Sequence, residues 1–245
     1  MFHTIFYVPL YNALIWLTTL SGGSLGLAVI GLTLLVKLIL SPLSYRSIVS
    51  QVEQKRLQPL VEELKKKYPD QKEQSQKLME LYKEHKTNPF AGCLLILLQL
   101  PVIIALYRVF LSGAAVVPAD LYSFVHAPAI VHAMFLGINM SSRNLILAIL
   151  AGISQFLQMQ WSPAMRNAPG AKAVRSEDMG TNMAASMTQS MKYTMPIMIA
   201  VFGYAVPGAV TLYWIVSNIF MILQERYVEN RMAKKAKNNV VVIKA

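Results

Sequence analysis

The sequence predicts an all-α polytopic membrane protein, and two observations lead to that prediction: its composition and the distribution of its charges. Of 245 residues, 55% are hydrophobic and only 14% are charged, whereas soluble domains carry about 25% charged residues. The apolar residues form long runs that alternate with short, strongly basic stretches, the layout of a chain that crosses a membrane several times. A single cysteine, Cys93, excludes an internal disulfide framework.

Five apolar segments qualify as membrane-spanning helices. The expected order is an outer-interface amphipathic helix at 1–21, a first span at 22–43, a cytoplasmic helical hairpin at 44–89, a second span at 90–112, an extracytoplasmic loop at 113–142, a third span at 143–161, a cytoplasmic loop at 162–192, a fourth span at 193–207, a fifth span at 208–224 and a basic cytoplasmic tail at 225–245. The fourth span is short, since about fourteen residues give ~21 Å of helix against a hydrocarbon core of ~30 Å. A locally thinned bilayer accommodates such a span.

Lys and Arg residues concentrate in three of the polar connections. Ten lie between residues 45 and 88, four between 162 and 192, and six after 224, which together hold 20 of the 23 basic residues. Two spans separate each of these stretches from the next, so all three fall on one side of the membrane. The positive-inside rule assigns that side to the cytoplasm. We therefore expect an N-terminus outside and a C-terminus in the cytoplasm.

The first 21 residues are expected to form a helix that lies in the outer membrane interface. They lack the basic start and the small-residue cleavage site of a signal peptide. Pro9 and Asn12 interrupt the apolar run, and Tyr7, Tyr11 and Trp16 are residues that anchor well at the interface. A sixth span is the alternative interpretation.

Residues 44–89 read as two helices broken at Tyr68-Pro69-Asp70. Each helix has one apolar face with i, i+3, i+4, i+7 spacing. The faces consist of Leu57, Leu60, Val61 and Leu64 in the first helix and Leu78, Leu81, Tyr82 and His85 in the second. A charged arm that only connects two spans is one interpretation. An interaction role is the other, and it is favoured because two spans need only a few residues between them.

One charged residue, Lys37, lies inside the apolar stretch "VIGLTLLVKLILSPL". An uncompensated charge in mid-membrane costs from ~3 to more than 10 kcal/mol, so such residues face a cavity or a partner. No Asp or Glu lies in any of the five expected spans, and a water-filled pocket is one solution. The other is that the side chain reaches toward the headgroups near Arg46, nine residues or ~13 Å away. The residues alone leave both interpretations open.

The chain shows no motif of an enzyme. It has no G-x-x-x-x-G-K-[ST] loop and no H-E-x-x-H, and its four histidines lack a metal-ligand spacing. We therefore expect no catalytic residues, no cofactor and no metal, and no nucleotide-driven pump or membrane protease. We expect the positive net charge of +11 to face the membrane surface rather than to provide specific nucleic-acid recognition.

Three stretches resemble the YidC/Oxa/Alb membrane protein insertases. They are "LMELYKEHKTNPFAGCLLILLQLPVIIALYRVF", "MFLGINMSSRNLILAILAGISQFLQMQ" and "MKYTMPIMIAVFGY…LYWIVSNIFMILQ". They occur in the family's order and with its five-span layout, from about residue 20 to 225. The sequence lacks the large extracytoplasmic domain and the lipobox of other members, so it is expected to be a minimal bacterial member located in the plasma (inner) membrane.

The resemblance implies that the spans enclose a hydrophilic groove, open to the cytoplasm and to lipid. Lys37 stands where family members usually carry an arginine, and Thr33, Tyr213 and Trp214 match further family positions. Gln155, Gln158, Ser217 and Asn218 are further polar residues that are candidates for the groove, as are Ser154 and Thr211.

The implied function is insertion and chaperoning of membrane proteins without nucleotide hydrolysis. The implied partners are nascent membrane-protein substrates and the lipid bilayer, with the ribosome, the signal recognition pathway and the Sec translocon as further candidates. Two other classes stay open: a small solute transporter, and a structural membrane subunit that depends on a partner. Solute flux in proteoliposomes would identify the first, and stable co-purification with one partner the second. Against a transporter, the spans show no repeated halves and no acidic relay.

Overall fold

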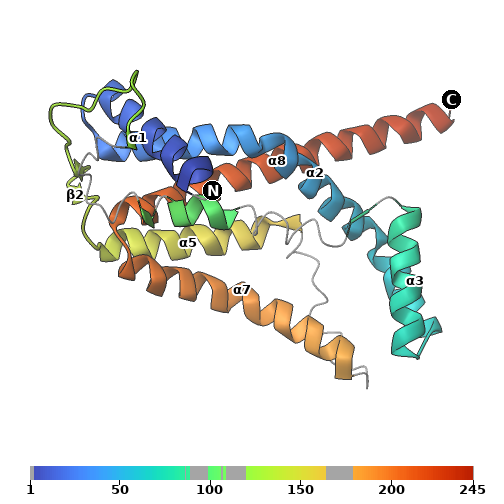
Figure 1. Ribbon diagram of the computed structural model, residues 1–245. Helices are drawn as coiled ribbons and strands as arrows, with labels where there is room; N and C mark the ends of the chain where they lie inside the picture. Colours follow the sequence, from blue (N-terminus) through green and yellow to red (C-terminus); the bar gives the residue numbers. More distant parts are fainter. Residues whose placement is uncertain are drawn as a thin grey trace.

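The computed structural model describes residues 3–85, 87–88, 99–105, 107–108, 120–163 and 179–244. Of the expected second span, only 99–105 and 107–108 are among these residues, and they are helical. Parts of the expected loops, 113–119 and 164–178, lie outside them. As the sequence predicts, the described chain is mostly helical. Figure 1 shows α5, α8 and the first part of α2 running along one long axis, with α1 at one end; at the other end the second part of α2 turns away from this axis toward α3.

The helices and strands follow in this order. They are the π-helix η1 (His3–Tyr7), α1 (Val8–Leu20), α2 (Leu25–Lys67), α3 (Gln71–Glu84), β1 (Met134–Phe135), β2 (Ile138–Asn139), α5 (Leu145–Trp161), α7 (Met179–Ala205) and α8 (Gly208–Lys244). Among the described residues, α2 is the one helix that is long and apolar enough to cross a membrane by itself, and α5 is a shorter apolar helix. The five-span layout therefore stays a prediction.

The helix α2 is continuous over 43 residues, or about 65 Å. It begins at Ser24, whose hydroxyl caps the Leu27 amide, and it passes through Pro42 and Pro59 without a break. At its other end the chain turns between Lys67 and Gln71, where the Asp70 carboxylate accepts a hydrogen bond from the Glu73 amide and starts α3. The residues of the expected first span and of the first arm of the hairpin thus belong to one helix.

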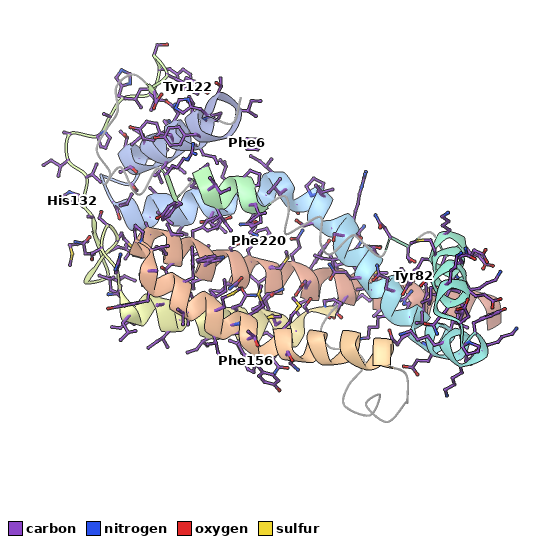
Figure 2. The ribbon with its side chains drawn as sticks, turned by 60° about the horizontal axis from the view of Figure 1, so that its bottom comes forward. Phe6, Tyr82, Tyr122, His132, Phe156 and Phe220 are labelled. Atoms are coloured by element: carbon purple, nitrogen blue, oxygen red, sulfur yellow. The ribbon has the colours of Figure 1, made fainter. Side chains whose placement is uncertain are left out.

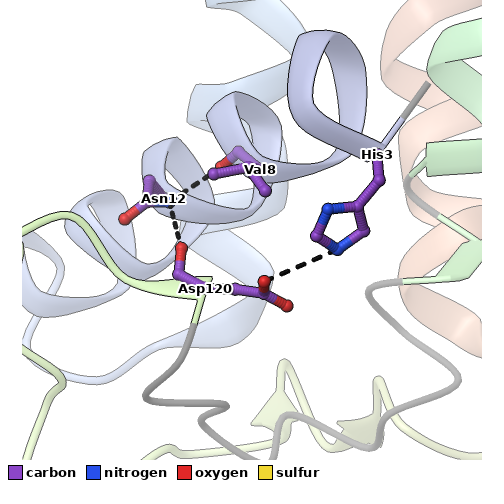
Figure 3. Close-up of polar contacts among 4 residues, drawn as sticks. All are labelled: His3, Val8, Asn12 and Asp120. Atoms are coloured by element: carbon purple, nitrogen blue, oxygen red, sulfur yellow. Dashed lines mark hydrogen bonds and ion pairs between the residues drawn. The ribbon is translucent and has the colours of Figure 1, made fainter. Parts of the chain in front are cut away.

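The helix α1 packs against α2 and is tied to the segment that precedes the strands. Asn12 is only 3% exposed. Its amide donates to the carbonyls of Val8 and Asp120, both at 2.8 Å, and its carbonyl oxygen accepts from the Tyr122 amide at 2.7 Å. Figure 3 shows the first two of these bonds together with the pair between His3 and Asp120, 3.5 Å apart. A residue that interrupts an apolar run in the sequence is therefore a link between two segments.

The two short strands form a hairpin that touches the first turn of α2. Leu136 and Gly137, at its tip, have φ values of 49° and 77°, a conformation that a type I′ turn requires. The Phe135 ring packs so closely on Gly26 of α2 that a Cβ on this glycine would come 2.2 Å from the ring. A backbone bridge also joins Ser24 to His132. Figure 2 shows His132 at this end, far from Tyr82 of α3. We call the two ends the β-hairpin end and the α3 end.

The helices α5, α7 and α8 pack through small residues. Gly152 of α5 faces α7 at Pro196 and Ala200. The turn at Val206-Pro207 reverses the chain into α8, where Thr211 donates to the Gly203 carbonyl at 3.0 Å. The Gly208 amide then bonds the Ser142 carbonyl at 2.8 Å. These contacts bring the start of α8 against the start of α5 at the β-hairpin end.

An apolar belt covers the outer surfaces of three helices. Its exposed members are Leu34, Leu35, Leu38 and Ile39 on α2, Leu145, Ile146, Ile149, Leu150 and Ile153 on α5, and Ile197, Met198, Val201 and Phe202 on α7. A soluble monomer rarely exposes so extensive an apolar surface. The interior between the helices, by contrast, contains polar side chains, among them Thr33, Lys37, Ser217 and Asn218. An apolar exterior combined with buried polar side chains is typical of a protein whose solvent is lipid.

Candidate functional site around Lys37

Lys37 of α2 is buried, with 8% of its surface exposed. Its Nζ atom lies 3.4 Å from Oε1 of Gln99, in the described part of the expected second span, and donates a hydrogen bond to it. The Gln99 Nε2 atom in turn donates to the hydroxyl of Tyr213 on α8. Three separate segments therefore meet in one continuous row of polar side chains, Lys37, Gln99 and Tyr213, which we call the polar chain.

The polar chain holds the ammonium group with neutral dipoles. Among the described residues, no carboxylate lies within ion-pair distance of Lys37. The side chain contacts Gln99 instead of a charged group. A cation that is buried against amide and hydroxyl dipoles keeps an uncompensated positive field. The arrangement can therefore attract an anion without first having to break an ion pair.

Thr33 lies one turn before Lys37 on α2 and is completely buried. Its hydroxyl donates to the backbone carbonyl of Val29 at 2.6 Å. The hydroxyl thus uses its one donor within its own helix, and its two lone pairs remain as acceptors for a donor from elsewhere.

Other predicted site residues form a second polar group, which we call the α5–α8 seam. Asn218 donates to the Ser154 hydroxyl at 3.1 Å, and Gln158 donates to Oε1 of Glu225 at 3.3 Å. Gln155 lies at the edge of this group, 3.5 Å from the Gln158 oxygen. The seam joins α5 to α8 through side chains other than those that contact Lys37.

Trp214 occupies a third position. Its ring packs edge-on against Phe202 of α7, with the ring centres 5.7 Å apart and the planes at 79°. The eight predicted site residues therefore lie in three places. Lys37, Thr33, Tyr213 and Ser217 are near the polar chain or on its helices, Gln155, Gln158 and Asn218 belong to the seam, and Trp214 contacts α7.

Two residues of these groups were not among the predicted site residues. Gln99 is the one polar residue in the apolar run 94–106, and that isolation is the signal that identifies it. Glu225 was assigned to the polar tail, but α8 continues past it and leaves it 3% exposed. Its signal is the helical spacing to Met221, Val228 and Met232, which lie among the apolar packing residues of α8. Among the described residues, no cluster of His, Cys, Asp and Glu could hold a metal ion.

A largely helical chain with an apolar belt outside and buried polar groups inside is an integral membrane protein. The sequence matches the model of the 60Kd inner membrane protein family over residues 16–236, and the chain belongs to that family. It is 35% identical to a protein of Fusobacterium nucleatum over 214 residues, covering 86% of this chain and 89% of that one. It is 33% identical to a protein of Oceanobacillus iheyensis over 247 residues, covering 96% and 86%. Both relatives are named membrane protein insertase YidC.

A solved structure shares the fold. It is described as an active YidC insertase crystal structure with the first transmembrane domain resolved, and it matches with a TM-score of 0.58 at 24% identity. The match covers 91% of this chain and 45% of that chain. The resemblance to the insertase family that the sequence suggested is thus confirmed, and the family is a bacterial inner membrane one.

Proposed function

We propose that this protein inserts hydrophobic segments of nascent proteins into the lipid bilayer and acts as a chaperone for them, without hydrolysing nucleotide. In this proposal five spans, at 22–43, 90–112, 143–161, 193–207 and 208–224, surround a groove that is open to the cytoplasm and to lipid. The N-terminus lies outside and the α3 end faces the cytoplasm. The observation that carries the proposal is the buried Lys37 ammonium, which donates to Gln99, while Gln99 in turn donates to Tyr213.

The electrostatic step begins when the hydrophilic flank of a substrate enters the groove. A carboxylate 4 Å from the Lys37 ammonium gains ~4 kcal/mol at an effective dielectric constant of 20. Gln99 holds the ammonium in place, but it does not neutralise the charge. The attraction thus offsets part of the cost of moving an acidic flank below the headgroups. Because the gain is only a few kcal/mol, the flank is held transiently and can leave.

The apolar part of the substrate provides the driving force. As it moves from water into lipid, each Å² of buried apolar surface contributes about 25 cal/mol. The exposed apolar face of α5 supports a path along the third and fifth spans, because Ile146, Ile149 and Ile153 present a continuous apolar surface beside the α5–α8 seam. Partition into lipid then completes insertion, and no nucleotide is needed.

The α3 end provides the surface for partners in this proposal. The ends of α2 and α3 carry an exposed, densely charged surface with the basic residues Lys66, Lys67 and Lys83. Nascent membrane-protein substrates and the bilayer are the partners of the reaction itself. The ribosome, the signal recognition pathway and the Sec translocon are candidates to deliver or receive the substrate at this end.

An insertion assay tests the proposal. The purified protein in liposomes would receive a single-span substrate with an acidic N-terminal tail, without nucleotide or Sec components. Protease protection of the tail would be compared for the wild type, Lys37→Met and the control Lys66→Met, which removes a positive charge from the exposed hairpin. We expect protection with the wild type and the control, and its loss with Lys37→Met. Protection no higher than in empty liposomes would contradict the insertase function. Equal protection with all three would retain the function and exclude Lys37 from it.

A further inference from the structure

A cleft opens between α2 and α8 at the α3 end. Figure 1 shows the two helices separating there, α2 toward α3 and α8 toward the C-terminus. The cleft has a volume of about 580 Å³. Its walls are formed by Val52, Lys55, Arg56 and Pro59 of α2 and by Glu229, Asn230, Met232 and Ala233 of α8. We call it the α2–α8 cleft.

We infer that the α2–α8 cleft binds the headgroup of an anionic phospholipid, with the phosphodiester against Lys55 and Arg56. This inference concerns a site separate from the polar chain at Lys37. It does not depend on the proposed insertase function.

The first argument is the level of the cleft relative to the hydrocarbon core of the membrane. Glu229 follows the start of α8 at Gly208 by 21 residues, or ~32 Å of helix, which matches a hydrocarbon core of ~30 Å. The α8 wall of the cleft therefore begins where the headgroups begin. On the α2 wall, the Ser50 hydroxyl and the Gln54 amide both contact the Asn88 backbone, immediately before the expected second span.

Aromatic residues with cations above them mark the same level. Arg226 lies over the Trp161 ring at the end of α5, 5.0 Å from its centre, and Arg231 lies over the Tyr45 ring of α2 at 5.9 Å. Trp and Tyr are enriched at the boundary between lipid and water, where basic residues also gather. Two independent pairs thus place the mouth of the cleft among the headgroups.

The chemistry of the walls is the second argument. Lys55 and Arg56 contribute two positive charges and Glu229 one negative charge, so the lining has a net charge of +1, which matches a single phosphodiester. Arg56 also pairs with Glu53 at 3.0 Å, with 44% of the Arg56 side chain and 36% of the Glu53 side chain exposed. Pairs of this kind contribute little to stability. Arg56 can therefore exchange its contact with Glu53 for a contact with a phosphate at a small cost in free energy. Arginine contacts phosphate through two parallel N–H groups, and lysine adds a point charge.

The inner part of the cleft favours a lipid over a soluble anion. Val52 is 7% exposed and belongs to an apolar cluster with Ile48 and Val228, and Met232 packs against that cluster. Among the residues that line the cleft, Val52, Pro59, Met232 and Ala233 give it an apolar surface, and Pro59 and Ala233 are exposed. The glycerol backbone and the first methylene groups of a phospholipid can cover this surface, whereas a free phosphate would leave it in water.

Native mass spectrometry of the purified protein tests the inference. The protein would be titrated with phosphatidylglycerol and with phosphatidylcholine of the same acyl chains. The variant Lys55→Gln/Arg56→Gln would be compared with Lys66→Gln/Lys83→Gln, which makes the same change of charge on the exposed outer part of the hairpin. We expect the first variant to bind phosphatidylglycerol about thirtyfold more weakly, since each surface cation contributes about fivefold. The second variant should bind like the wild type.

A third variant and a soluble competitor complete the test. Ala233→Trp fills the cleft without changing its charge and should also abolish the preference for phosphatidylglycerol. Glycerol phosphate should fail to displace the lipid at equal concentration. The inference would be overturned if the wild type did not prefer phosphatidylglycerol, if the control variant lost as much binding as the cleft variant, or if Ala233→Trp bound normally. Displacement by glycerol phosphate would instead assign the cleft to a soluble anion and overturn the lipid assignment.

Discussion

Gln224 of α8 donates hydrogen bonds to both the backbone carbonyl and the hydroxyl of Ser41 on α2, each at 3.1 Å. Ser41 lies one helical turn beyond Lys37 and immediately before Pro42. The backbone carbonyl of Ser41 would ordinarily pair with the amide four residues later, so a bond from Gln224 adds a second donor to it. The contact fixes α8 against α2 next to the candidate site.

Replacement of Gln224 tests this contact. Gln224→Met keeps the length of the side chain but removes both donors, and the expected loss of stability is ~1–2 kcal/mol. The measurement is the thermal unfolding midpoint of the protein in detergent. Leu223→Met, at the neighbouring exposed position, is the matched control and should leave the midpoint unchanged. An unchanged midpoint for Gln224→Met would show that the two bonds contribute nothing net.

The crossing of α5 and α7 depends on the absence of a side chain at Gly152. A Cβ there would come 2.9 Å from the Ala200 Cβ and 3.1 Å from the Pro196 carbonyl oxygen. Gly152→Val should therefore force the helices apart and destabilise the protein by ~1–3 kcal/mol. Gly31→Ala is the control, because its Cβ would meet only ordinary contacts with Leu17, at 3.5 Å and beyond. Equal thermal midpoints for the two variants would contradict the close crossing.

The variant Gln99→Glu should lower insertion activity without lowering the thermal stability of the protein. The new carboxylate would lie where the amide oxygen now accepts from Lys37, 3.4 Å away, and would neutralise the ammonium. We expect thermal stability to be retained and insertion of a substrate with an acidic tail to fall at least about tenfold, since a Coulomb gain of ~4 kcal/mol is cancelled.

The matched control for this change is Gln155→Glu, which adds the same carboxylate at the edge of the α5–α8 seam. It should insert the acidic-tailed substrate far better than Gln99→Glu does. Insertion by Gln99→Glu at the wild-type rate would argue that the charge of Lys37 does not attract the substrate.

Asn12 should be essential for the position of α1. Asn12→Leu removes one acceptor and one donor that bond residues 120 and 122, and it leaves their part-buried backbone groups without those partners. The expected cost is ~1–3 kcal/mol. Limited proteolysis between 120 and 126 should become faster in this variant. Asn12→Asp keeps the acceptor for the Tyr122 amide, so its proteolysis rate should lie between those of the wild type and Asn12→Leu. Identical rates for all three would contradict the link.

The fold class and the family could be predicted from the sequence, because both are encoded in long patterns. Apolar runs separated by basic stretches predict membrane helices through many residues at once, so a few polar exceptions do not change the result. The resemblance to the family likewise rests on many residues in three long stretches, so single differences do not remove it. The number of spans and the side of each terminus stay predictions.

The contacts of the site could not be predicted, because they depend on which helices are neighbours. Lys37 and Gln99 are 62 residues apart, and Gln99 and Tyr213 are 114 apart. Periodicity places each residue on a face of its own helix, but it does not say which other helix that face meets. For the same reason the sequence did not distinguish Tyr213, which contacts Gln99, from its neighbour Trp214, which contacts Phe202.

The first arm of the hairpin and the buried Lys37 lie on the same helix, α2. Thirty residues separate Lys37 from Lys67, which is about 45 Å measured along the helix. The opposite end is fixed where Phe135 packs on Gly26. If the part of α2 beyond Lys37 swung by about 10°, its far end would move by at most about 8 Å. Because Gln224 holds Ser41 and Phe135 packs on Gly26, the segment between these two contacts would stay in place, and Lys37 would keep its position while the hairpin moved.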